Sequence, residues 1–193
     1  MDYFTNLYYM LKTMLYYRIF FKSIGRKSII RRPLLLLNTQ YIDIGERVFI
    51  RDNVRLEVVC LNNKIPQLSI GHNTNIEQNV HIICHDSLKI GRDVSITANC
   101  AIVDVTHPYN ILTEKIGTCI SSETSKVIIG DGTFIGIGSV ILPNVIIGKR
   151  VVIGANSVVT KDIPDYSIAV GNPARVIKRF NLETGKWEKV AEL

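Results

Sequence analysis

The chain is poor in cysteine, and its cysteines lack the spacing that would give them a structural role. Its 193 residues include four cysteines, Cys60, Cys84, Cys100 and Cys119, and no two of them form a C-x-x-C pair. A disulfide framework or a cysteine-based zinc site requires dense, paired spacing. We therefore expect free thiols, no bound metal and a reducing compartment, for which the cytoplasm is the default.

The chain also lacks an apolar run long enough to cross a membrane, which takes about 20 mainly apolar residues. Residues 1–22 come nearest, but Asn6, Lys12, Arg18 and Lys22 interrupt them. One side of a helix here would carry Leu7, Leu11, Met14 and Leu15. That side can pack on the body of the protein, on a partner subunit or shallowly on a bilayer. We favour packing on protein, and peripheral contact with the inner face of a membrane stays open.

The chain has no nucleic-acid-binding motif to match its positive charge. Its net charge is +6 and its isoelectric point is near 9.2, so an anionic partner is expected. An aromatic-rich RNP pattern, a zinc finger and a basic zipper region are all missing from the sequence. A membrane surface and a phosphorylated cofactor therefore both remain as anionic partners, and nucleic acid is the weaker choice.

Aliphatic residues recur at every sixth position over much of the chain, in five blocks of three. The block members are Ile44, Ile50, Leu56; Ile70, Ile76, Ile82; Ile90, Ile96, Ile102; Ile129, Ile135, Ile141; and Ile147, Ile153, Val159. Three hexads suffice for one triangular coil with a short strand on each side, and such coils bury their inner rows by stacking. A β-sandwich would instead show period-2 alternation with turn signals at other spacings. The repeat therefore predicts an all-β solenoid.

The longest break in the repeat follows a histidine. Ile90 and Ile129 are 39 residues apart, so this block exceeds the 18 residues of three hexads by 21. The excess corresponds to residues 108–128, directly after His107. A long excursion from a regular solenoid usually carries function, because packing does not require it.

The C-terminal half carries a family resemblance. Residues 129–178 read IGDGTFIGIGSVILPNVIIGKRVVIGANSVVTKDIPDYSIAVGNPARVIK. This string resembles the hexapeptide-repeat acyltransferases, above all the sugar and polysaccharide O-acetyltransferases such as the maltose, galactoside, lipopolysaccharide and capsule enzymes. The resemblance implies a left-handed parallel β-helix of about five coils, a homotrimer with sites between subunits, and acetyl-CoA as cosubstrate.

The expected organisation has three parts. Residues 1–35 are expected to form a helical, aromatic N-terminal segment, and residues 36–165 the β-helix with its extended loop at 108–128. Residues 166–193 are expected to form a C-terminal extension that contacts CoA.

The resemblance implies that His107, in the string DVTHPYN, is the general base. An imidazole near neutrality can take the proton of a sugar hydroxyl while its oxygen attacks the thioester, and can then protonate the departing thiolate. Asp104, three residues earlier, can hold the imidazole in the required tautomer, as carboxylates do in other dyads. A backbone carbonyl can do the same, so this assignment stays open.

The resemblance also places the CoA contacts. They fall on Gly136, Ile137, Ala155, Thr160, Lys161, Arg175 and Lys178. Small residues let the pantetheine arm approach the backbone, and cations pair with phosphates. Amides near Gly136 and Ile137 are the expected donors to the oxyanion of the tetrahedral intermediate.

Counted back from His107 without gaps, Glu77, Asn79 and His85 fall where the resemblance to the sugar acetyltransferases implies acceptor contacts. Glu77 and His85 differ from the residue types of the maltose and galactoside enzymes. The string NIEQNVHI is more similar to the lipopolysaccharide and capsule enzymes. We therefore expect the acceptor to be a sugar of a surface polysaccharide, its precursor or a related glycan.

Three other functions remain as alternatives. One is acetyl transfer to serine or an antibiotic, because the CoA half of the site is shared. Another is a zinc-dependent β-helix carbonic anhydrase, with His81, His85 and His107 as ligands. The last is a scaffold without catalysis that uses its first 22 residues as an anchor.

Overall fold

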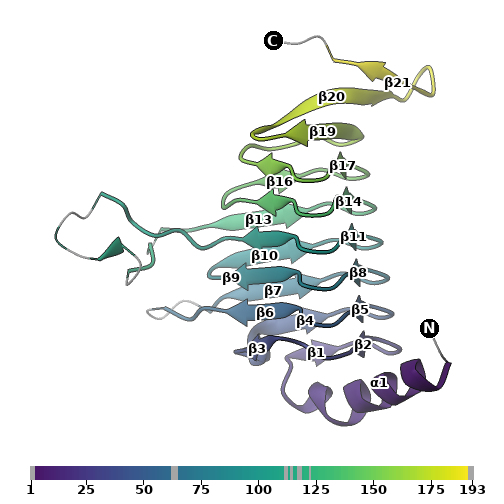
Figure 1. Cartoon of the computed structure of the whole chain (residues 1–193), viewed down its shortest axis with the longest axis vertical. Coiled ribbons are helices and arrows are strands. Elements are labelled where there is room, and N and C mark those ends of the chain that lie inside the picture. The colour runs from purple at the N-terminus through teal and green to yellow at the C-terminus, as the bar shows by residue number, and fades with distance from the viewer. Residues whose placement is uncertain are drawn as a thin grey trace.

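The protein is a β-helix closed at its N-terminal end by a helix and extended at its C-terminal end by an antiparallel hairpin (Figure 1). The computed structural model describes residues 3–61, 65–110, 113, 115–116, 119–121 and 123–190. Within these residues, no helix combines the length and the apolar character that crossing a bilayer requires.

Three parallel sheets form the sides of the solenoid, and each coil contributes one short strand to each sheet. The first sheet contains β1 (Ser23–Ile24), β4 (Ile42–Ile44), β7 (Gln67–Ile70), β10 (Ser87–Ile90), β13 (Lys126–Ile129) and β16 (Ile146–Ile147). The second contains β2 (Ile29–Ile30), β5 (Phe49–Ile50), β8 (Asn75–Ile76), β11 (Ser95–Ile96), β14 (Phe134–Ile135) and β17 (Val152–Ile153). The third contains β3 (Leu35–Leu37), β6 (Arg55–Val58), β9 (His81–Cys84), β12 (Ala101–Val103), β15 (Val140–Ile141) and β18 (Val158–Val159).

The ends of the solenoid are built differently. Helix α1 (Tyr3–Leu15) and the short 3-10 helix η1 (Tyr17–Ile19) precede β1, and a second 3-10 helix, η2 (Thr39–Tyr41), leads into β4. At the other end β19 (Ser167–Gly171) joins the second sheet and turns back antiparallel through β20 (Ala174–Asn181) and β21 (Lys186–Lys189).

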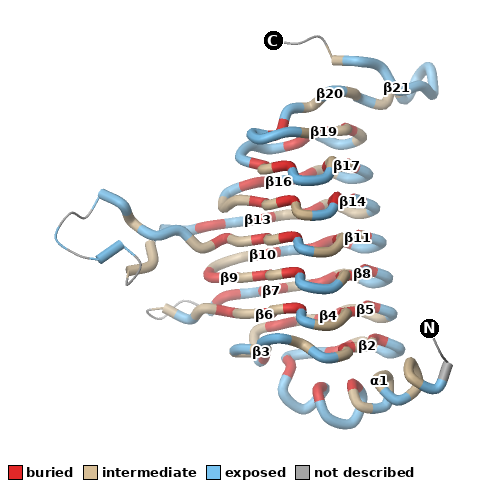
Figure 2. Tube along the Cα trace, viewed as in Figure 1, coloured by how far each residue is buried: buried red, intermediate tan, exposed pale blue. Residues whose placement is uncertain are grey.

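The hexad residues form the core, as the repeat predicts. In the first sheet, Ile44, Ile70 and Ile90 stand in register in successive coils, and all are buried. Buried positions run in inner rows along the whole solenoid (Figure 2). Because each coil covers the aliphatic row of its neighbours, stability accumulates by stacking.

Small polar residues complete the interior at the corners. Thr74 and Ser139 are buried, and their hydroxyls donate to the carbonyls of Gly91 and Gly154 in the next coil, each at 2.9 Å. These bonds satisfy polar groups that the core would otherwise leave unpaired. The turns use residues with positive φ, most often asparagine, which tolerates this conformation better than other side chains.

The described residues contain one coil more than the five found in the sequence. Ile24, Ile30 and Leu36 lie on β1, β2 and β3 and continue the inner rows by pairing with the coil of β4 to β6. The expected boundary at residue 35 therefore falls inside the first coil. The expected loop at 108–128 is also shifted, because β12 ends at Val103 and β13 begins at Lys126.

Candidate active site

The long excursion from the solenoid leaves at the corner between the third and first sheets. It connects β12 to β13, which lie in adjacent coils, and projects sideways from the stack (Figure 1). His107 is the fourth residue after β12, and its side chain is exposed. The solenoid therefore fixes the root of this excursion, and the histidine stands just outside the stack.

A backbone carbonyl sets the tautomer of His107. Its Nδ1 lies 2.6 Å from the carbonyl oxygen of Cys119, on the returning part of the same excursion. A carbonyl oxygen can only accept, so Nδ1 carries the hydrogen and Nε2 presents a lone pair. This is the tautomer that a general base acting through Nε2 requires.

Asp104 does not orient His107 in this chain. Its side chain is fully buried, and its carboxylate accepts hydrogen bonds from the backbone amides of His85 and Asp86 in the preceding coil, the latter at 3.0 Å. The carboxylate joins two coils at the root of the excursion. The sequence left two groups that could orient the His107 ring, the Asp104 carboxylate and a backbone carbonyl. In the structure, a backbone carbonyl contacts the ring.

Burial dominates the electrostatics around Asp104. It raises the pKa of the Asp104 carboxyl above its usual value, although the His85 and Asp86 amides act in the opposite direction. Burial together with the charge of Asp104 also raises the pKa of the neighbouring Cys84 thiol. Cys84 is therefore a protonated thiol at neutral pH and a poor nucleophile.

We expect Asp104→Ala to lower the free energy of unfolding by about 2 to 4 kcal/mol, because it leaves two amides without acceptors. The urea midpoint of the variant, measured at the parent's protein concentration, checks this. Glu183→Ala, at an exposed position of the β20–β21 turn, is the matched control. Equal midpoints for parent and Asp104→Ala would contradict the role given to this carboxylate.

The three residues expected to contact the acceptor do not lie together. Glu77 and Asn79 follow β8 at the corner between the second and third sheets. There Glu77 pairs with Arg51, with 2.7 Å between Oε2 and Nε, and Asn79 donates to the side chain of Asn99 at 3.0 Å. His85 alone lies at the corner of the long excursion.

His85 is buried beneath the root of that excursion. Its amide donates to Asp104, and its Nδ1 lies 3.4 Å from the carbonyl of Val59. Its Nε2 is buried and has no hydrogen-bond partner among the described residues.

Three of the seven expected CoA contacts line one basic cleft. Lys161, Arg175 and Lys178 border a cavity of about 1130 Å³ between the last turn of the solenoid and the β20–β21 hairpin. Arg179 and Lys189 line the same cavity, and among the described residues Asp162 is the one acidic residue of its lining. The carboxylate of Asp162 accepts a hydrogen bond from the Ile146 amide at 2.7 Å. A cleft with this excess of cations suits the phosphates of a nucleotide.

Gly136, Ile137 and Ala155 lie at another corner, between the second and third sheets. A Cβ built on Gly136 would stand 2.6 Å from the amide nitrogen of Ala155, so these two residues stack in adjacent coils. The Gly136 amide donates to the carbonyl of Ile153 at 2.8 Å and is not available to an oxyanion. The Ile137 amide has no partner in the described part of the chain, so it is the remaining donor of this pair.

Comparison with known proteins gives the family. The model described as bacterial transferase hexapeptide (six repeats) matches residues 126–161. WbbJ of Escherichia coli (strain K12), whose name assigns it to lipopolysaccharide biosynthesis as an O-acetyl transferase, is 31% identical over 93% of this chain and 91% of its own. The chain belongs to the hexapeptide-repeat family of acetyltransferases.

Two further proteins similar to this hexapeptide-repeat acetyltransferase are an O-acetyltransferase and an N-acyltransferase. A galactoside O-acetyltransferase of Lactococcus lactis (strain IL1403) is 33% identical over 76% of this chain and 67% of its own. The crystal structure of AntD, an N-acyltransferase from Bacillus cereus in complex with dTDP and 3-hydroxybutyryl-CoA, superposes with a TM-score of 0.72. It is 25% identical and covers 87% of this chain and 88% of its own.

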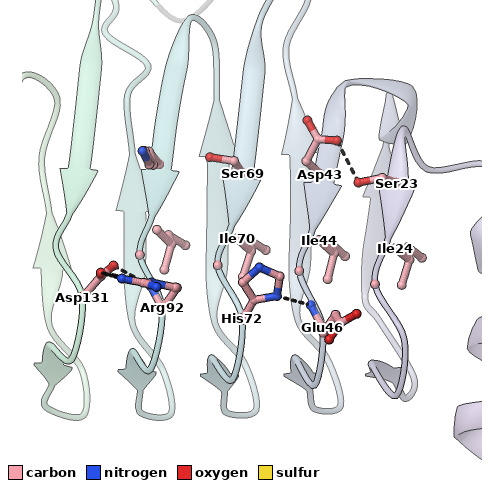
Figure 3. Close-up of a pocket in the computed structure, with 16 residues that line it drawn as sticks. Ser23, Ile24, Asp43, Ile44, Glu46, Ser69, Ile70, His72, Arg92 and Asp131 are labelled. Atoms are coloured by element: carbon pink, nitrogen blue, oxygen red, sulfur yellow. Dashed lines mark hydrogen bonds and ion pairs between the residues drawn. The ribbon is translucent and has the colours of Figure 1, made fainter.

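A second groove of the hexapeptide-repeat acetyltransferase has a different character. It measures about 630 Å³ and runs over β1, β4, β7 and β10, away from all the residues expected in the site (Figure 3). Its polar groups contact one another. Arg92 Nη2 lies 2.9 Å from Asp131 Oδ2, and His72 Nδ1 accepts a hydrogen bond from the Glu46 amide at 2.8 Å. No group of three or more metal-binding side chains occurs among the residues that were placed.

The sequence pointed to only part of the candidate site of this hexapeptide-repeat acetyltransferase. It did not single out the Cys119 carbonyl, because a main-chain oxygen leaves no trace in residue type. Arg179 and Lys189 belong to a basic tail that is visible in the sequence, but the antiparallel pairing of β20 with β21 brings them to the cleft. A hairpin signal at Thr184-Gly185 is what a search for that pairing could have used.

Proposed function

We propose that the chain transfers the acetyl group of acetyl-CoA to a hydroxyl of a sugar in a surface polysaccharide, its precursor or a related glycan. The observation that carries the proposal is the exposed His107 ring, whose Nδ1 faces the Cys119 carbonyl and whose Nε2 presents a lone pair. The relationship to WbbJ and to a galactoside O-acetyltransferase supports a sugar hydroxyl as the acceptor.

The residues support a direct transfer. Nε2 of His107 takes the proton of the sugar hydroxyl as its oxygen bonds to the thioester carbon. The carbonyl oxygen becomes an oxyanion, for which the Ile137 amide is the candidate donor. The carbon–sulfur bond then breaks, and the imidazolium returns the proton to the CoA thiolate, so His107 ends the cycle in its starting state.

A complete site needs more than one chain in this proposal. His107 lies at the corner between the third and first sheets, whereas Ile137 and Ala155 lie at the corner between the second and third. A trimer brings these groups together if the corner that carries Ile137 and Ala155 in one subunit faces His107 of its neighbour. Closed cyclic assembly is the usual form for identical subunits. We place the reaction in the cytoplasm.

An assay of acetyl-CoA consumption tests the function. The protein is incubated with acetyl-CoA and free, nucleotide-linked and lipid-linked sugars in turn, and products are identified by mass spectrometry. An acceptor-dependent thiol release with an acetyl ester on the sugar supports the proposal. Release that no glycan stimulates, while serine or an antibiotic does, would favour the alternative acceptors.

A second candidate is transfer to the amine of an amino sugar carried on a nucleotide. The similarity to AntD, an N-acyltransferase crystallised with dTDP, favours it. The bond formed distinguishes the two candidates, because an ester is cleaved by mild alkaline hydroxylamine and an amide is not. A product that survives this treatment would support N-acylation.

We expect the double variant Arg175→Gln, Lys178→Gln to raise the dissociation constant of CoA roughly 10- to 100-fold, since it removes two cations from the cleft. Isothermal titration calorimetry with CoA at low and high salt measures the change. When the salt concentration rises, the affinity for CoA should fall more in the parent than in the variant. Lys186→Gln, on the same hairpin but outside the lining, is the control. An unchanged dissociation constant in the double variant would mean that the nucleotide part of CoA binds outside this cleft.

A further inference from the structure

Helix α1 turns a polar residue inward, toward the first coil. Thr13 is fully buried. Its hydroxyl accepts a hydrogen bond from the Ile30 amide at 2.8 Å and donates one to the Tyr9 carbonyl at 2.7 Å. Tyr17 and Phe21, just after the helix, are buried in the core. These contacts fix the rotation of α1 about its axis and so determine which side chains face outward.

The side of α1 that faces solvent is apolar. Phe4, Tyr8, Leu11 and Leu15 follow one helical stripe, and they are 74%, 61%, 46% and 72% exposed. Tyr16, Ile19 and Phe20 extend this surface beyond the helix and are also exposed. We call these seven residues the outer face of α1. Of the three surfaces considered for this side of the helix, the body of the same chain does not cover Leu11 and Leu15, which leaves a partner subunit or a bilayer.

The outer face is adjacent to a shallow hollow at the end of the solenoid. The hollow measures about 670 Å³ and is lined by Tyr8, Leu11, Lys12, Leu15, Tyr16 and Tyr17. Figures 1 and 2 show α1 at the end of the stack opposite to β21. The apolar surface therefore terminates the molecule and does not lie along its side.

The positive charge of the chain is concentrated at the same end. Residues 1–42 contain seven lysines and arginines and one acidic residue, a net charge of +6. The remaining residues contain 16 basic and 16 acidic side chains, so they contribute no net charge. Arg18 and Lys27 in this segment are exposed, and neither has a carboxylate partner within the described ranges.

We propose that the outer face of α1 seats the protein on an anionic lipid surface. An apolar helix face bordered by cations is the combination that binds the boundary between acyl chains and acidic headgroups. The exposed Tyr8 and Tyr16 also suit that boundary, because tyrosine is enriched at the interface between membrane and water. A second copy of the chain fits less well, because pairing these ends would bring two positively charged segments together, including the exposed Arg18 and Lys27 of each copy.

Flotation of the full chain with lipid vesicles tests the proposal. One vesicle is phosphatidylcholine alone, and the other replaces part of it with phosphatidylglycerol. The parent should float with the anionic vesicle and should be released as salt rises. Leu11→Gln, Leu15→Gln should reduce the partition coefficient about tenfold or more, since both positions face outward and glutamine is tolerated in helices.

Matched controls separate the outcomes. Arg18→Gln, Lys27→Gln should weaken binding to the anionic vesicle only, and Leu182→Gln, at an exposed apolar position of the opposite end, should bind as the parent does. Equal binding by the parent and Leu11→Gln, Leu15→Gln would overturn the proposal. So would a parent that binds neither vesicle, or a leucine variant whose assembled mass changes by light scattering while its vesicle binding does not. That last result would make the outer face an interface between copies.

Discussion

His107→Ala should lower the rate of acetyl transfer by roughly two to four orders of magnitude, the usual contribution of a positioned general base. The ring is exposed, and its contact to the Cys119 carbonyl orients Nε2 without burying the base. Steady-state kinetics of thiol release against a glycan acceptor measures the loss. The dissociation constant of CoA should stay near that of the parent, because the basic cleft does not include His107.

His107→Gln serves as the companion variant. The glutamine amide can still donate to the Cys119 carbonyl, so the excursion keeps its contact, but no basic nitrogen remains. Both variants should therefore be equally slow. Raising the pH of the assay should not bring the rate of either variant closer to that of the parent. Parent-like turnover in either one would remove His107 from the mechanism.

Gly71→Ala should destabilise the solenoid by about 3 kcal/mol or more, although it adds a single methyl group. A Cβ at residue 71 would stand 2.4 Å from the carbonyl oxygen and 2.5 Å from the carbonyl carbon of Gly91 in the next coil. These are backbone atoms held by the stacking hydrogen bonds, including the Gly71 amide to the Ile90 carbonyl at 2.9 Å. Adjacent coils must separate to admit the methyl group.

Thermal and urea unfolding at a fixed protein concentration measure this effect. Ser69→Ala, on the outer surface of β7 two residues earlier, is the control and should unfold as the parent does. If Gly71→Ala were as stable as Ser69→Ala, close stacking of the glycines would not limit the spacing of the coils.

The solenoid could be predicted from the sequence because its core repeats. Each inner position needs an aliphatic side chain, so Ile70, Ile76 and Ile82 mark one coil by residue type alone. The first coil obeys the same rule at Ile24, Ile30 and Leu36, and Gly25 follows as Gly45 follows Ile44. The predicted helical segment, argued from residues 1–22, extended to residue 35 and so covered most of this coil.

The site could be predicted only in part, because its contacts depend on how separate coils face one another. The position of His107 follows from the break in the repeat. The partner of Asp104 does not, since two amides of the preceding coil compete with the imidazole for the carboxylate. The rotation of α1 about its axis could not be predicted either. Thr13 faces inward because its hydroxyl accepts a hydrogen bond from the Ile30 amide, and hydrophobic periodicity does not reveal such a contact.

The excursion leaves the solenoid after β12 and returns at β13, which lie in adjacent coils and on different sheets. Its length and composition are therefore nearly independent of the stack, and an exchange of this segment with that of a relative leaves the inner rows unchanged. Insertions or substitutions in this segment therefore need no compensating change in the rest of the polypeptide. The stability of the coils can thus be inherited separately from the length and sequence of the excursion.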